Sequence, residues 1–208
     1  AATKKGAYWN AHNNLGATYI AQAMENPSRA AELADKAAAQ LEIAAKVKET
    51  SEVHANMATI SLWKGNPYKA ASHANAALNG ANSDVTRGVN GIKGACEIYM
   101  AKYDAAVRSE SAAVETDVNL FNKGLAQLLT KDYANATTSF GESTRKNANY
   151  AIAYYGAAIA AARSGNGDGV VSNLSSAVKI DASLKDKALT DLEFSKFATT
   201  DSFRNALK

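Results

Sequence analysis

The 208-residue sequence contains one cysteine, two prolines and no long run of apolar residues. The single Cys96 excludes an intramolecular disulfide and a zinc site built from several cysteines. A membrane-spanning helix needs roughly 18 consecutive apolar residues, so we expect no membrane insertion. The 23 basic and 20 acidic side chains are scattered along the chain, and this pattern predicts no nucleic-acid partner.

Residues that favour β-structure are also scarce. Valine and isoleucine are few, whereas alanine makes up about a fifth of the chain. Alanine has the smallest free-energy penalty for entering a helix, and β-branched residues prefer strands. The composition therefore predicts an all-α fold.

Four similar segments recur along the chain, each between two apolar-periodic stretches. They end at Ala70, Ala106, Ala136 and Val170, which are 36, 30 and 34 residues apart. Seven residues further on stand Ala77, Ala113, Ser143 and Ala177. Small residues seven apart lie on one face of a helix, where a neighbouring helix can approach closely. This spacing indicates repeated pairs of packed helices.

The residues within these units resemble the tetratricopeptide repeat (TPR) family. His12, Leu15, Gly16 and Tyr19 follow the family's pattern on the first helix of a repeat, and the run Ala136, Phe140 and Ser143 follows that of the second helix. Departures include Lys93 and Lys123 at positions where leucine is expected. The resemblance implies an all-α, right-handed α-solenoid of about five antiparallel helix pairs plus C-terminal capping helices.

We assign the whole chain, 1–208, to a single superhelical domain. Its repeats are expected at about 7–46, 51–80, 86–115, 117–146 and 149–180. The predicted helices are 6–24, 28–46, 51–64, 67–79, 86–100, 103–115, 118–130, 133–145, 149–164 and 168–179. Pro27 and Pro67 suit the first turn of a helix, with Asn26 and Asn66 as caps before them, and Asp132 suits the cap of another.

The segment 184–208 does not follow the repeat period. A solenoid must cover its last apolar face, so this segment is predicted to be a cap that uses Leu189, Leu192, Phe194, Phe197, Phe203 and Leu207. Its pattern is similar to the ending of many bacterial TPR proteins. Together with the composition, this favours a bacterial protein, with a periplasmic or exported location preferred to a cytoplasmic one.

The TPR resemblance also implies a concave groove lined by the first helix of each repeat. The groove positions carried over to this sequence are mostly apolar and aromatic, which suits a hydrophobic peptide or helix. The candidate partner-binding residues are Asn13, Leu62, Trp63, Ile98, Tyr99, Phe121, Leu125, Leu128, Tyr155 and Ile159. An alternative interpretation is that part of this stripe packs between repeats or under the cap.

No pattern in the sequence predicts catalysis, a metal or a cofactor. His12, His54 and His73 are too far apart for ligand pairs on one helix, and Cys96 lies beside small residues without an activating partner. The glycine-rich stretch 164–169 lacks the remaining residues of a phosphate or calcium loop and is interpreted as a turn.

Two functions therefore remain open. The first is a non-enzymatic scaffold that binds a peptide or protein in its concave groove, without the lysine and asparagine set of chaperone-binding TPRs. The second is a structural or oligomerisation module of a larger bacterial envelope-associated protein or assembly. Exposure of the groove aromatics favours the first, and their burial favours the second.

Overall fold

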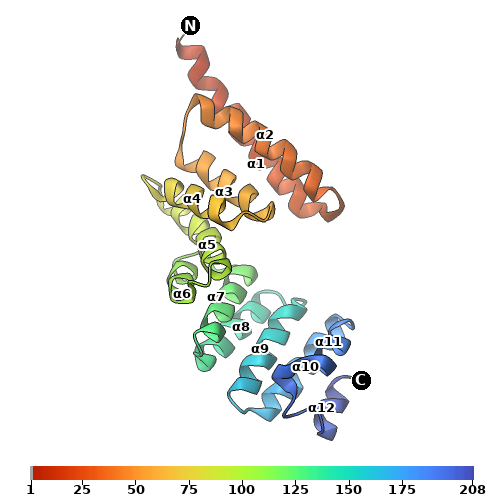
Figure 1. Ribbon diagram of the computed structural model, residues 1–208. Coiled ribbons are helices and arrows are strands. Elements are labelled where there is room, and N and C mark those ends of the chain that lie inside the picture. Colours follow the sequence, from red (N-terminus) through yellow and green to blue (C-terminus); the bar gives the residue numbers. More distant parts are fainter. Residues whose placement is uncertain (1) are drawn as a thin grey trace. The chain divides into compact units, whose positions relative to one another are not determined.

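The protein is described by a computed structural model that covers residues 2–208, with side chains from Tyr8 onward (Figure 1). Helices and turns account for all of the regular structure of these residues, and none of them lies in a strand. None of the described helices is long and apolar enough to cross a membrane. The helices are α1 (Ala2–Glu25), η1 (Pro27–Arg29), α2 (Ala30–Val47), α3 (Ser51–Trp63), α4 (Pro67–Leu78), α5 (Ser83–Tyr99), α6 (Tyr103–Ser111), α7 (Asp117–Leu129), α8 (Tyr133–Lys146), α9 (Ala151–Arg163), α10 (Gly167–Ile180), α11 (Leu184–Thr190), η2 (Leu192–Phe194) and α12 (Asp201–Ala206).

The contacts between helices divide the chain into two compact units. Unit 1 holds α1 to α5 and residues 112–114, and unit 2 holds α6 to α12. Within unit 1, α1 packs on α2, and α4 packs on both α3 and α5. Within unit 2, α8 packs on both α7 and α9, and α10 packs on α9. The division falls inside the predicted repeat 86–115, whose first helix lies in unit 1 and whose second lies in unit 2.

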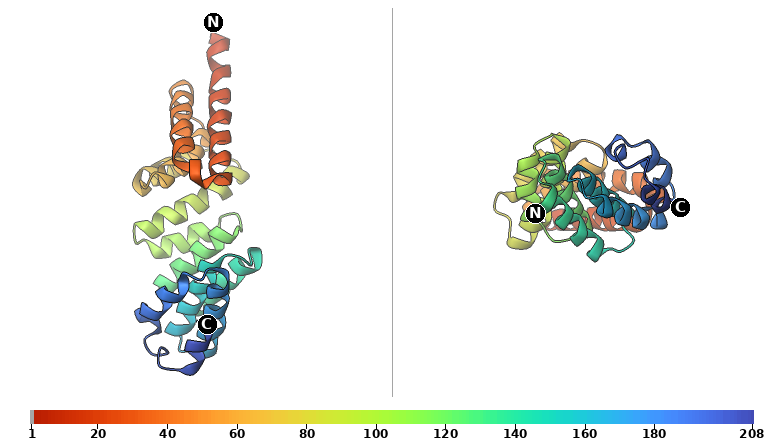
Figure 2. Two further views of the ribbon diagram at one scale, coloured as in Figure 1. Left: turned by 90° about the vertical axis from the view of Figure 1, so that its right-hand side faces the viewer. Right: turned by 90° about the horizontal axis from the view of Figure 1, so that it is seen from below.

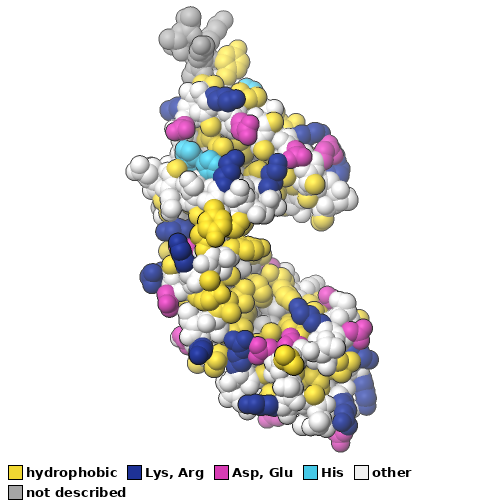
Figure 3. All heavy atoms as spheres, in the orientation of Figure 1, with side chains coloured by type: hydrophobic (Ala, Val, Ile, Leu, Met, Phe, Trp, Pro, Cys, Tyr) yellow, Lys and Arg dark blue, Asp and Glu magenta, His cyan; other side chains and the backbone are white. Residues whose placement is uncertain are grey.

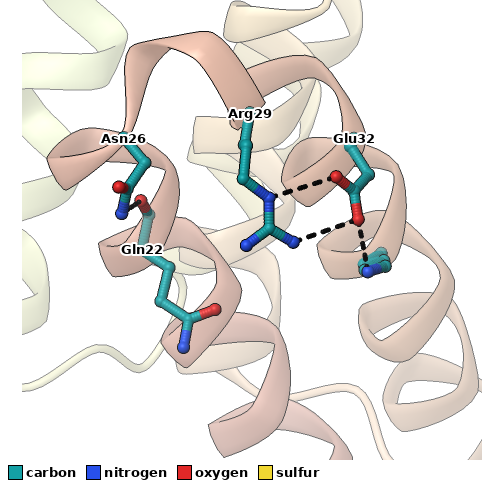
Figure 4. A network of polar contacts seen from close by, with 5 residues as sticks. Gln22, Asn26, Arg29 and Glu32 are labelled. Atoms are coloured by element: carbon teal, nitrogen blue, oxygen red, sulfur yellow. Dashed lines mark hydrogen bonds and ion pairs between the residues drawn. The ribbon is translucent and has the colours of Figure 1, made fainter.

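The predicted caps are confirmed at two helix starts and wrong at a third. The side chains of Asn66 and Asp132 accept hydrogen bonds from backbone N–H groups at 3.0 and 3.3 Å. Asn26 makes no such bond, because the short helix η1 separates it from α2. The side-chain amide of Asn26 donates instead to the Gln22 carbonyl oxygen at 3.1 Å, while Arg29 pairs with Glu32 on the first turn of α2 (Figure 4).

Four turns between helices share one backbone conformation. Gly65, Ala101, Lys131 and Gly165 follow α3, α5, α7 and α9, and all have a positive φ between 56° and 77°. In each turn the N–H after this residue bonds to a carbonyl oxygen five residues back; for example, Lys102 N donates to Glu97 O at 2.8 Å. This pair of features defines the Schellman motif, which satisfies carbonyl groups left free at a helix end. The turn segments identified in the sequence thus have a common structure.

The small residues of the repeats lie where the helices approach most closely. In unit 1, Ala58 of α3 and Ala70, Ala74 and Ala77 of α4 are fully buried. In unit 2, Phe140 of α8 is fully buried, and a Cβ placed on Gly124 or Gly156 would lie 2.8 Å from its ring. These glycines leave space for the ring between α7 and α9, because a side chain at either position would clash with it.

The C-terminal segment covers one end of unit 2, as predicted. Figure 2 shows this segment, coloured blue, against α9 and α10. Phe194, Phe203 and Leu207 are buried there with residues of α9 and α10. The prediction is wrong for Leu189 and for Leu192, whose residue surface is 86% exposed. Each short helix can turn only one face toward α9 and α10, and these two leucines lie on the other face.

Candidate functional site

The ten groove residues predicted from the sequence divide evenly between the two units. Unit 1 carries Asn13 on α1, Leu62 and Trp63 on α3, and Ile98 and Tyr99 on α5. Unit 2 carries Phe121, Leu125 and Leu128 on α7, and Tyr155 and Ile159 on α9. The two sets have different surroundings, so we describe them separately.

In unit 1 the exposed members of the set lie at the ends of two neighbouring helices. Trp63 is the last residue of α3 and Tyr99 is the last residue of α5, and these helices pack side by side. Their surfaces are 40% and 73% exposed. Leu62 and Ile98, the residues before them, are partly buried. We call these four residues the α3–α5 apolar surface. Hydrophobic side chains reach the surface of the molecule over α5 in Figure 3.

A hollow lies directly beside Trp63. Its volume is ≈ 520 Å³, and it is lined by Trp63 and Lys64 together with Ala30, Ala31, Ala34 and Asp35 of α2. The Lys64 Nζ and Asp35 Oδ1 atoms, 2.6 Å apart, form an ion pair that links α3 to α2. The hollow therefore combines an aromatic wall, a patch of alanine methyl groups and a charged pair. An apolar side chain flanked by polar groups would fit such a surface.

Asn13 is buried and connects two helices of unit 1. Its side-chain oxygen accepts a hydrogen bond from the Asn56 amide of α3 at 3.0 Å. A buried amide without a partner would cost free energy, so this bond fixes the packing of α1 on α3. The contact accounts for Asn13 without a ligand.

The α7 residues pack mainly within unit 2. The Phe121 ring, which is partly buried, lies 5.6 Å from the Phe140 ring and 5.5 Å from the Tyr150 ring, measured between centroids. Leu125 and Leu128 belong to the same apolar cluster, and Leu128 is buried. Only part of Phe121 and Leu125 is therefore available to another molecule.

On α9 the chain covers the predicted groove positions with its own C-terminal segment. Tyr155 is only 2% exposed, and its hydroxyl donates to Asp191 Oδ2 at 2.8 Å. The edge of its ring meets Phe194 with the centroids 5.6 Å apart. Nearby, Arg163 pairs with Glu193, with Nη2 and Oε1 2.6 Å apart. Ile159 packs against the same cluster. Residues 191–194 thus occupy the position that a peptide was expected to take.

The groups considered for chemistry in the sequence have structural surroundings. Cys96 is buried, and its burial raises the pKa of the thiol to about 11, so the reactive thiolate is disfavoured at neutral pH. In the glycine-rich stretch, Asn166 caps α10 by accepting from Gly169 N at 3.0 Å. Among residues 8–208, no group of three or more His, Cys, Asp or Glu side chains is arranged to hold a metal ion.

One contact was missed by sequence reasoning. His54 of α3 and His73 of α4 lie together across the helix hairpin, with their Nδ1 atoms 3.2 Å apart. Spacing along a single helix does not indicate such a pair, because the two histidines lie on different helices. The signal was present, because α3 and α4 are joined by a short turn and pack on each other, so side chains on their facing sides can meet.

Comparisons with known proteins place this fold among TPR structures. No protein-family model matches the chain, and no curated protein matches its sequence. The structure is similar to that of MamA (TM-score 0.64, 14% identity, covering 77% of this chain and 96% of MamA). It is also similar to YrrB, described as a TPR protein with an unusual peptide-binding site (TM-score 0.61, 18% identity, 79% and 85% covered). PilF of Pseudomonas aeruginosa gives a TM-score of 0.58 at 17% identity, with 94% and 97% covered.

Proposed function

We propose that this chain, an all-α helical-repeat protein with the TPR fold, is a non-enzymatic scaffold that binds a peptide or protein partner through the α3–α5 apolar surface of unit 1. The observation that carries the proposal is the exposure of Trp63 and Tyr99 at the ends of adjacent helices. Tryptophan and tyrosine are enriched among the residues that contribute most to binding energy in protein interfaces.

The hollow beside Trp63 supports the same location. A volume of ≈ 520 Å³ accommodates one or two large apolar side chains, and the Asp35–Lys64 pair at its edge offers polar contacts to a peptide backbone. The similarity to YrrB, which is described as having a peptide-binding site, agrees with a peptide ligand. The proposal does not include Tyr155, which residues of the C-terminal segment cover, or Ile159, which packs against the same apolar cluster.

The test is a site-specific photo-crosslinking experiment in lysate of the source organism. A photoreactive phenylalanine analogue replaces Tyr99 in one sample and Tyr68 in another. Tyr68 is a matched control, because it is 72% exposed but lies at the start of α4 outside the α3–α5 apolar surface. We expect a discrete partner protein to be crosslinked at position 99 and not at position 68.

A variant completes the test. The double substitution Trp63→Ala and Tyr99→Ala, with folding confirmed by circular dichroism, is expected to lose the partner, whereas Tyr68→Ala retains it. Truncation of a central interface aromatic typically costs about 2 kcal/mol or more, or roughly thirtyfold in affinity. Equal recovery of the partner by the double variant and by Tyr68→Ala would contradict the proposed surface.

The alternative function, self-association as a structural module, has its own supporting observation. Leu189 and Leu192 are exposed on the C-terminal segment, and two neighbouring exposed leucines can form a contact between copies. Sedimentation of the intact chain beside a Leu189→Ser, Leu192→Ser variant distinguishes the two functions. An oligomer that dissociates in this variant, without partner loss in the Trp63 and Tyr99 variant, favours the structural role.

A further inference from the structure

His54 and His73 form a close pair at the surface of unit 1. His54 lies in the first turns of α3 and His73 in the middle of α4. Their Nδ1 atoms are 3.2 Å apart, and their rings are stacked with centroids separated by 5.4 Å and planes inclined by 29°. Figure 3 shows histidine atoms at the surface over α3 and α4. The pair is thus held by two elements, with the His54 side chain 15% exposed and His73 Nε2 buried.

The hairpin fixes the two rings in place. Ala58 and Ala70 are fully buried and let the helices approach closely on the side of the turn. At the other end of the hairpin, the Ser51 hydroxyl donates to the Asn79 carbonyl oxygen at 3.4 Å, which links the start of α3 to the end of α4. The Thr50 side chain caps α3 by accepting from Val53 N at 3.3 Å. The backbone positions of both histidines are therefore set by contacts that do not involve the rings.

The separation of the two nitrogens equals that of two ligands on one metal ion. Imidazole nitrogens bind zinc at about 2.0–2.1 Å, so two of them on a tetrahedral ion stand roughly 3.3 Å apart. The observed 3.2 Å meets this requirement without movement of the backbone. We propose that His54 and His73 form a two-imidazole site for a divalent transition-metal ion of the zinc, copper or nickel type.

The protonation of the pair suits this role. Only the neutral imidazole binds a metal. Burial lowers the pKa of His73 below its usual value, repulsion from His54 and Lys69 lowers it further, and only Glu49 acts in the opposite direction. In the metal-free pair, one Nδ1 donates a proton to the other. When a metal ion binds, the donor ring loses its proton from Nδ1 and gains a proton at Nε2. Both rings then remain neutral, and no net proton is released.

A carboxylate stands near the opposite edge of the His54 ring. Glu49 Oε2 lies 4.0 Å from His54 Nε2, and the Glu49 side chain is largely exposed and free to approach. Metal-binding histidines commonly donate their second N–H to such a carboxylate, which fixes the ring and increases its basicity. Glu49 is thus placed to orient His54 once Nδ1 is bound to the ion.

The two imidazole nitrogens determine which metal ions can bind to the pair. Imidazole nitrogens suit zinc, copper and nickel, whereas calcium and magnesium require oxygen ligands. Since no larger group of His, Cys, Asp and Glu surrounds the pair among the described residues, water completes the coordination. The bound ion would connect α3 to α4 in the helix hairpin whose first helix ends at Trp63. The site does not depend on the proposed partner binding.

The test uses the full 208-residue chain, stripped with a chelator, and Zn²⁺ as the probe. Calorimetric titration at neutral pH is expected to show one Zn²⁺ bound per chain, and thermal unfolding is expected to shift upward with Zn²⁺. His54→Ala and His73→Ala should each weaken Zn²⁺ binding by at least about tenfold, as losses of metal-site contacts do. The double variant, which lacks both imidazoles, should bind Zn²⁺ more weakly than either single variant.

The control is His12→Ala, which removes the remaining histidine. His12 Nδ1 contacts the Gln40 side chain at 2.7 Å on another helix pair, so its loss should leave Zn²⁺ affinity unchanged. Circular dichroism confirms that each variant is folded, and His54→Gln replaces any alanine variant that is not. Absence of Zn²⁺ binding in the intact chain, or equal binding in all variants, overturns the proposal.

Discussion

The Tyr155 hydroxyl donates a 2.8 Å hydrogen bond to Asp191 Oδ2, across 36 residues of sequence. Around this bond, Arg163 pairs with Glu193, and Phe194 packs against the Tyr155 ring. An acidic and aromatic stretch of the chain therefore lies on α9 in the place where the family resemblance predicted a partner. In unit 2, the face of α9 serves the stability of the fold.

Tyr155→Phe is expected to destabilise the protein by about 1 kcal/mol, because Asp191 loses a buried hydrogen-bond donor. Urea unfolding monitored by circular dichroism measures this change. Tyr68→Phe is the control, since Tyr68 is 72% exposed, and its stability should match the parent. A Tyr155→Phe variant as stable as the parent would show that the bond contributes nothing.

Gly124→Ala is expected to destabilise the protein by about 1–3 kcal/mol through overpacking. Its new Cβ would lie 2.8 Å from the Phe140 ring, and Gly156 packs equally closely on the same ring, which therefore has no room to move. Gly141→Ala is the matched control, because a Cβ there meets nothing within 4 Å. This variant should be neutral or more stable by up to about 1 kcal/mol.

Ala101→Gly is expected to stabilise the protein by about 0.5–1 kcal/mol. Ala101 has a φ of 56°, a left-handed conformation that costs a residue with a Cβ about 1–2 kcal/mol and glycine almost nothing. The reverse substitution Gly165→Ala, at the equivalent turn, should destabilise by about 1 kcal/mol. Chemical unfolding of both variants tests whether their changes in stability have opposite signs. A change of the same sign in both would contradict the energetic cost assigned to a Cβ at the left-handed position.

Stability should decrease as the pH falls from about 7.5 to about 5.5 in chelator-containing buffer. The pKa of His73 is lower in the folded chain than in the unfolded chain, mainly through burial. In this range the unfolded state therefore binds more protons. The contribution of neutral His73 to stability is complete at pH values above its pKa in the unfolded chain. This contribution is lost as the pH falls through the pKa of His73 in the folded chain. His73→Gln should reduce this dependence, and urea unfolding of this variant and of the parent at both pH values measures the difference.

The repeat pattern was sufficient to predict the fold from the sequence. Helix pairs, turn positions and the buried residues Ala70, Ala106, Ala136 and Val170 follow from small residues at regular spacing. These features are local or recur with a fixed period, so a single sequence shows them. Asn66 and Asp132 illustrate this, because a cap depends on residues only three positions away.

The candidate surface was less predictable, because exposure depends on contacts that are distant in sequence. Trp63 and Tyr155 were both predicted to line the groove, yet Trp63 is exposed and Tyr155 is covered by residues 191–194. The period ends before this segment, and no pattern indicates which helix it covers. Pairing of His54 with His73 likewise required the register of two helices, not the spacing along one.

The turns after α3, α5, α7 and α9 keep one backbone conformation although their left-handed positions hold two glycines, an alanine and a lysine. Their hydrogen bonds use main-chain N–H and carbonyl groups, which nearly every amino acid supplies. This turn conformation can therefore persist when most of the side chains around it are replaced. Sequences that differ at most positions can thus adopt the same architecture, and a comparison of backbone paths detects this likeness of fold.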